Sequence, residues 1–108
     1  MKLIYAIVRS DDDSRVIEAL NKQSYSVTKL ATTGGFLKSG NTTLIIGTEQ
    51  EKVDEVIHII KTECGNRKRM VVTSPPILGS GSSSSLPVTV DIGGATIFVM
   101  DVERFEKI

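Results

Sequence analysis

The residues best suited to chemistry lie in one predicted turn, within the stretch KLATTGGFLKSGNTTLIIG at residues 29–47. Phe36 and Leu37 stand between a Gly-Gly pair and a Ser-Gly-Asn sequence, where a simple chain reversal would use only small or polar residues. A phenylalanine ring offers a face on which an aromatic base can stack, a contact worth roughly 1–3 kcal/mol. Leu37 is placed to cover the other side of the same base. The turn therefore predicts a site for a flat, aromatic ligand.

Polar groups around this turn extend the prediction from a base to a nucleotide. Asn41 carries a donor and an acceptor, the pattern that reads an adenine edge with two hydrogen bonds. Gly35 lets a ligand approach the main chain closely, and Gly47 leaves room for a ring. Thr28 adds a hydroxyl, and Lys38 adds a charge suited to phosphate. These residues predict a nucleotide pocket without a catalytic group. On the residues alone, the equal alternative is a hairpin whose two apolar side chains pack into a neighbouring subunit.

Other reactive residue types do not combine into a catalytic or metal site. His58 lies off the apolar stripe of its predicted helix, and Cys64 has no histidine beside it, so we expect a solvated imidazole and a buried thiol. The Gly-Ser run at 79–85 lacks the Gly-Lys-Ser/Thr of a phosphate-binding loop. The acidic run 11–13 is interpreted as a helix cap, and the basic run 67–69 as a solvated helix end. We expect no enzyme activity, no metal and no cofactor.

The elements that must position the turn follow from hydrophobic periodicity. Strands are predicted at 2–9, 26–33, 41–48, 87–92 and 95–100. One helix follows the acidic run, with an apolar face of Val16, Ala19 and Leu20 and with Ile17 beside it. A second follows a Thr-x-x-Glu capping box at Thr48 and Glu51, with a stripe of Val53, Val56, Ile57, Ile60 and Cys64.

This order of strands and helices predicts the α+β class, a ferredoxin-like βαββαβ sandwich with an extra C-terminal strand. We expect a single domain spanning 1–108, with a short loop at 33–41 and a long flexible loop at 65–86. Both faces of the sheet are apolar in the pattern, and two helices cover only one face. We therefore expect oligomerisation to cover the other face.

Composition narrows the function classes. The 13 basic and 13 acidic residues balance, so no net charge attracts nucleic acid or an anionic membrane. A single cysteine excludes an internal disulfide and fits a reducing cytoplasm. The apolar run near the N-terminus is too short to span a membrane. The expectation is a cytoplasmic protein without membrane insertion.

The block TKLATTGGFLKSGNTTLIIG, together with GGATIFV near the C-terminus, resembles the signature of PII-like signal-transduction proteins that act as cyclic di-AMP receptors. The similarity runs along the whole chain and weakens in the Ser-rich segment. The resemblance implies a homotrimer that binds cyclic di-AMP in clefts between subunits. It also implies a short loop after the second strand and a long one after the second helix.

Carried over to this sequence, the resemblance implies eight ligand-contacting residues. Phe36 and Leu37 would hold one adenine, and Asn41 would hydrogen-bond a base. The other five would line the cleft: Val27, Thr28, Gly35, Gly47 and Gly94. Groups of the neighbouring subunit would lie near Val27 and Gly94. Ser26 departs from the pattern, because a basic residue there in relatives could pair with a phosphate.

The implied mechanism is signalling, in which the ligand orders one or both loops and changes the affinity for an unknown partner protein. One alternative is a PII-type sensor of ATP or another mononucleotide, which requires more cationic residues near the pocket. A second is single-stranded RNA binding, which the zero net charge and few aromatics disfavour. A third is a purely structural trimeric interaction protein that binds no nucleotide.

Overall fold

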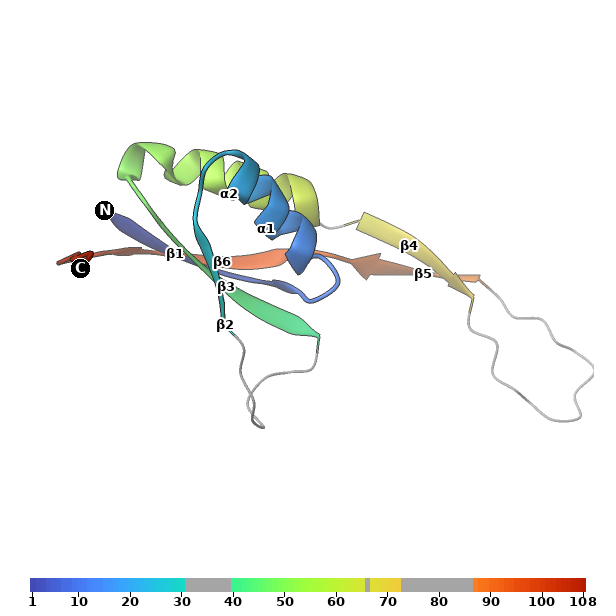
Figure 1. Cartoon of the computed structure of the whole chain (residues 1–108). Helices are drawn as coiled ribbons and strands as arrows, with labels where there is room; N and C mark the ends of the chain where they lie inside the picture. The colour runs from blue at the N-terminus through green and yellow to red at the C-terminus, as the bar shows by residue number, and fades with distance from the viewer. Residues whose placement is uncertain (31–39, 66, 73–86) are drawn as a thin grey trace, which may run out of the picture.

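The fold consists of a four-stranded sheet covered on one face by two helices, with a separate hairpin beyond it (Figure 1). The computed structural model describes residues 1–30, 40–65, 67–72 and 87–108. In chain order the elements are β1 (Lys2–Arg9), α1 (Asp13–Lys22), β2 (Val27–Leu30), β3 (Asn41–Thr48), a 3₁₀ turn (Gln50–Lys52), α2 (Val53–Cys64), β4 (Arg67–Val72), β5 (Pro87–Ile92) and β6 (Ala95–Asp101). The sheet is antiparallel in the order β2-β3-β1-β6. This arrangement is compatible with the predicted ferredoxin-like class.

The core lies between the sheet and the helices because every second residue of the central strands is apolar and points to that side. Fully buried side chains come from β1, β3 and both helices: Ile4, Ala6, Leu44, Ile46, Val16, Leu20, Val56 and Ile60. Burial of each large aliphatic side chain contributes about 1.5–3 kcal/mol before entropy costs. The predicted apolar faces are confirmed for these four helix residues, with Ile17 and Val53 half-buried at their margins. Ala19 and Ile57 are only half-buried, and Ile59 packs against the core although it was not predicted to do so.

The predicted start of the second helix was wrong. Thr48 is still part of β3, where it pairs with Lys2, and no side chain caps either the 3₁₀ turn or α2. The far end of α2 follows the prediction. Cys64 is fully buried on the apolar stripe, whereas His58 is exposed.

The C-terminal third differs from the prediction in its strand partners. Strand β5 was expected in the main sheet with 95–100 as an extra strand; instead β6 is the fourth sheet strand, beside β1. The expected loop at 65–86 is interrupted by β4, which pairs with β5 in a two-stranded sheet. Gly93 and Gly94 have φ of +91° and +95°, angles that side chains disfavour, and this break lets the two flanking strands take different partners. Residues 73–86 lie outside the described part.

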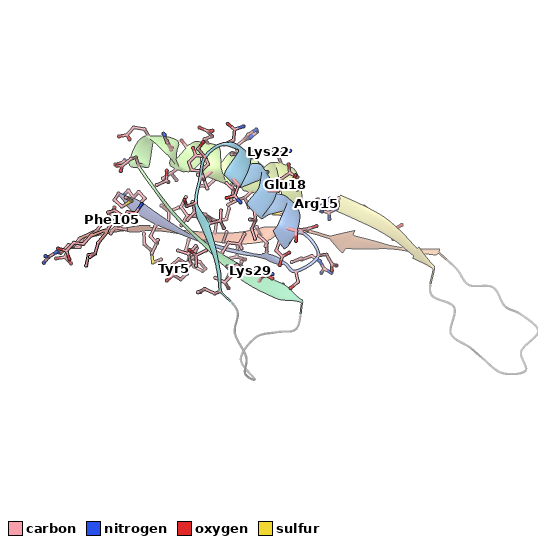
Figure 2. The ribbon with its side chains drawn as sticks, in the orientation of Figure 1. Tyr5, Arg15, Glu18, Lys22, Lys29 and Phe105 are labelled. Atoms are coloured by element: carbon pink, nitrogen blue, oxygen red, sulfur yellow. The ribbon has the colours of Figure 1, made fainter. Side chains whose placement is uncertain are left out.

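The sheet face opposite the helices is apolar, as predicted. We call it the open face; its apolar residues are Leu3, Tyr5, Ile7, Leu30, Ile45, Phe98 and Met100. Tyr5 points away from the helices in Figure 2. Phe98 is 53% exposed and Met100 is 40% exposed, although their neighbours on β1 are half-buried.

In the part of the chain that the structure describes, no helix is long and apolar enough to cross a membrane.

Candidate functional site

Three of the predicted ligand residues share the open face. Thr28 on β2 is paired with Ile45, and Gly47 on β3 is paired with Leu3. Because paired residues point to the same side of a sheet, both belong to the open face. Asn41, the first residue of β3, is in the same phase and is exposed. Asn41 and Gly47 are nevertheless six residues apart on one strand, which corresponds to about 20 Å at roughly 3.4 Å per residue. Within one chain, these two residues cannot contact the same base.

Two further predicted residues lie elsewhere. Val27 is on the helix-covered side of β2 and packs against the core. Gly94 lies at the bend before β6, where its N–H donates a hydrogen bond to the carbonyl of Cys64 at the end of α2. A hollow of about 540 Å³ opens beside this bend; its lining includes Ile57, Lys61, Gly94 and Ile97. Gly94 is thus beside a space that could receive a ligand or a neighbouring chain.

Gly35, Phe36 and Leu37 lie outside the described residues, as does Lys38. What the structure does describe is the stem that carries them, defined here as β2 together with Gly40 and β3. The N–H of Ser10 donates to the carbonyl of Gly40 over 2.7 Å. The hydroxyls of Ser10 and Thr42 are 3.0 Å apart. These bonds fasten the base of the stem to the loop between β1 and α1.

A buried carboxylate joins both strands of the stem. Asp13, which is 5% exposed, accepts a hydrogen bond from the Thr42 hydroxyl over 3.0 Å. The ammonium group of Lys29 lies 3.0 Å from the same Asp13 oxygen, Oδ2. Burial raises the pKa of Asp13, but the bonds from Lys29 and Thr42 outweigh it and hold the pKa below its usual value. Asp13 is therefore an anion that fixes the strand flanking Asn41.

The neighbouring carboxylate, Asp12, holds a different element. It is 1% exposed, and its Oδ1 lies 2.7 Å from Nη2 of Arg67 at the start of β4. Arg15 on α1 pairs with the same oxygen. Burial again raises the pKa of Asp12, but the two guanidinium groups outweigh it and lower the pKa below its usual value.

These two contacts were missed in the sequence. The acidic run was interpreted as a helix cap. Asp12 does precede α1, but its backbone is in the right-handed helical region and no side chain makes a capping hydrogen bond there. The basic run was interpreted as a solvated helix end, yet Arg67 begins a strand and pairs with Asp12. A signal did exist. Thr42 and Lys29 are in phase with buried apolar neighbours of their strands, and polar side chains at such positions require partners.

Arg9 is a further residue that the sequence analysis did not single out. It pairs with Asn41 across β1 and β3 and therefore belongs to the open face. Its side chain is 46% exposed, and its guanidinium is 3.5 Å from Asp11, a weak surface contact. A cation suited to a phosphate therefore lies beside Asn41.

A hollow outside the predicted site opens between α1 and α2. Its volume is about 400 Å³, and its lining includes Arg15, Glu18, His58 and Glu63. None of the predicted ligand residues borders it. Among the described residues, no group of three or more His, Cys, Asp or Glu side chains is placed to hold a metal ion.

The fold is a small α+β sandwich with an apolar open face and with the stem at one edge of its sheet. The chain matches the family described as cyclic-di-AMP receptor over residues 1–108, and it belongs to that family. A crystal structure of a protein from Pediococcus pentosaceus ATCC 25745, described as functionally unknown, is similar to it. The two are 39% identical with a TM-score of 0.78, over 99% of this chain and 96% of that one. The predicted family is confirmed, and it favours a binding role over catalysis.

Proposed function

We propose that this chain is a cytoplasmic signalling protein that binds cyclic di-AMP between the subunits of a homotrimer. The observation that carries the proposal is the match to the cyclic-di-AMP receptor family along the whole chain. Ligand binding reorders the loops, and the reordered form has a different affinity for a downstream protein. Phe36 and Leu37 clamp one adenine, Gly35 admits the ligand to the main chain, and Asn41 reads a base edge.

The open face supports the trimer. Phe98, Met100 and Leu30 are 53%, 40% and 38% exposed in the isolated chain, on a face that no helix covers. Contiguous apolar surface of this kind marks an interaction site. Other copies of the chain are the economical cover because the same face is available on each of them.

The spread of the predicted residues supports a site shared between subunits. Asn41 and Gly94 lie at the Arg9 end of the sheet, whereas Gly47 lies at the other end, near Leu3. One dinucleotide would contact all of them only if different chains supplied different groups. In this arrangement one subunit provides Asn41 and the turn before it, and its neighbour provides Gly47, with Val27 and Thr28 on the adjoining strand.

Arg9 supports the recognition of a phosphate. Ser26 lacks the charge that the resemblance associates with that position, and Arg9 lies across from Asn41. Arg9 supplies a cation at the Asn41 end of the sheet, whereas Ser26, just before Val27, lies toward the Gly47 end. Among the described residues, Arg9 is the cation in register with Asn41, and one such charge suits the single charges of a cyclic dinucleotide better than a triphosphate, which disfavours the alternative of an ATP sensor.

A thermal-shift panel of cyclic di-AMP, cyclic di-GMP, ATP and an RNA oligomer tests the proposal. A ligand that binds the native state stabilises it by about 2.7 kcal/mol at 100 times the Kd. The melting temperature therefore rises with ligand concentration. We expect a rise with cyclic di-AMP alone. A rise only with ATP and Mg²⁺ would favour the mononucleotide sensor, and no rise with any ligand would favour the structural trimer.

A further inference from the structure

The loop between β1 and α1 holds two parts of the molecule that otherwise share no strand pairing. On one side is the stem, formed by β2, Gly40 and β3. On the other side is the hairpin of β4 and β5, which pairs with no strand of the four-stranded sheet. Figure 1 shows this hairpin extending away from the sheet, beyond the end of α2. In the described part of the chain, the contacts between the hairpin and the rest can therefore be named one by one.

Arg67 makes the side-chain contacts that anchor the hairpin. Its Nη2 donates to Asp12 Oδ1 over 2.7 Å, and its Nη1 lies 3.4 Å from the carbonyl of Gly65. Among the side chains that the structure describes, the pair of Arg67 with Asp12 is the sole ion pair between the hairpin and the remainder of the chain. The main chain adds the bond from the Gly94 N–H to Cys64.

The next residue, Asp13, anchors the stem by the same kind of contact. Its Oδ2 receives both the Thr42 hydroxyl and the Lys29 ammonium group at 3.0 Å. Asp12 and Asp13 are consecutive, and both are almost fully buried. Both carboxylates are carried by the same short stretch of main chain, so a shift of that stretch moves the two anchors together.

The Asp12 carboxylate uses only one of its two oxygens. Its Oδ2 is buried and has no hydrogen-bond partner among the described residues, while Oδ1 serves both Arg67 and Arg15. An unpaired buried carboxylate oxygen is costly, so a rotation that offers Oδ2 to one of the two guanidinium groups would offset part of that cost. Coupling between two elements, here the stem and the hairpin, requires a contact that can adopt two different arrangements.

We propose that Asp12 and Asp13 form a two-carboxylate link that couples the stem to the β4–β5 hairpin. A ligand that contacts the stem then changes the stability of the hairpin, and the hairpin changes ligand affinity by the same factor, because linkage is reciprocal. This effect of a ligand rests on the proposed binding of cyclic di-AMP. The link between the stem and the hairpin concerns this chain alone and is testable without any ligand.

The ligand-free test is hydrogen–deuterium exchange of the amides of 67–72 and 87–92 in the Lys29→Gln variant. Loss of the ion pair leaves Asp13 Oδ2 held by the Thr42 hydroxyl alone, so we expect hairpin amides to exchange about 5-fold faster or more, the lower end of typical couplings. Lys22→Gln is the matched control, because its surface pair with Glu18 touches neither carboxylate. The amides of α2 report any global loss of stability. Hairpin exchange equal to that of the control would overturn the link.

The ligand test uses Arg67→Gln and compares it with Arg15→Gln. Both remove a cation from Asp12, but only Arg67 belongs to the hairpin. Cyclic di-AMP should alter hairpin exchange in the wild type and in Arg15→Gln. It should leave the hairpin unchanged in Arg67→Gln while still binding in a calorimeter, and Arg67→Lys should restore the response. A full response in Arg67→Gln would refute the coupling. Absence of binding to the wild type would instead refute the proposed function, and the Lys29→Gln result would still decide the link.

Discussion

At the level of single residues, the account depends on Asn41 and Phe36 contacting a base. Replacing either residue with Ala should weaken binding of cyclic di-AMP by about 1–3 kcal/mol, or roughly 5- to 150-fold, because a base-edge pair or a stacking face is lost. Asn41 is exposed, so its replacement should leave the unfolding midpoint nearly unchanged. Calorimetric titration measures the affinities, with exposed His58→Ala as the control. Unaltered affinity in both variants would refute the assigned site.

Asp12 and Asp13 also predict how stability depends on pH. Both carboxyl groups have pKa values below the usual one in the folded state. Their stabilisation is therefore complete above the unfolded pKa, about 3.9, and is lost as the pH falls through the folded pKa. Asp13→Asn should lower the free energy of unfolding at pH 7 by about 1–3 kcal/mol. The difference from wild type should shrink in acid.

Urea denaturation of the two proteins at neutral pH and near pH 3 measures this difference. Ser14→Ala is a suitable control, because it removes only a 3.2 Å hydrogen bond to Asp13 and leaves the Lys29 and Thr42 contacts in place. A difference between wild type and Asp13→Asn that is constant with pH would show that the charge of Asp13 does not stabilise the stem.

At the level of elements, two glycines with positive φ offer a matched comparison. Gly93, with φ of +91°, joins β5 to β6, and an added Cβ would lie 2.7 Å from the carbonyl oxygen of Gly65. Gly40, with φ of +106°, has no atom within 4 Å of such a Cβ. Gly40→Ala should cost only the backbone strain, about 1–3 kcal/mol. Gly93→Ala should cost more, because a backbone oxygen must also move. Equal unfolding midpoints for the two variants would contradict the tight packing at Gly93.

The same elements show which parts of the fold are predictable. Strands β1 and β3 were predicted to the residue, because alternation of apolar side chains is a local pattern. Strand β4 was missed, since its basic first half has no apolar alternation and its pairing with β5 spans a long intervening segment. Arg67 finds Asp12 at a separation of 55 residues, which no local pattern records. Thr28, Asn41 and Gly47 share the open face, and their contact with a ligand stays a prediction.

At the level of the whole molecule, the open face predicts the oligomeric state. Phe98→Asp places a charge on the apolar open face, paired across from Tyr5, and burial of an unpaired carboxylate costs several kcal/mol. Sedimentation should show a trimer for the wild type and a monomer for the variant. His58→Asp, on the helix side, should remain a trimer. A trimer that tolerates Phe98→Asp would place the subunit contact elsewhere.

The measurement that tests the central claim most directly is calorimetric titration of the wild-type protein with cyclic di-AMP, with cyclic di-GMP as the control ligand. The account predicts saturable binding of cyclic di-AMP near one ligand per chain, because each of three equivalent clefts takes one molecule. It predicts no binding of the guanine dinucleotide, whose base edge does not match the Asn41 amide. Absence of heat with cyclic di-AMP, at protein concentrations where the trimer is intact, would contradict the account.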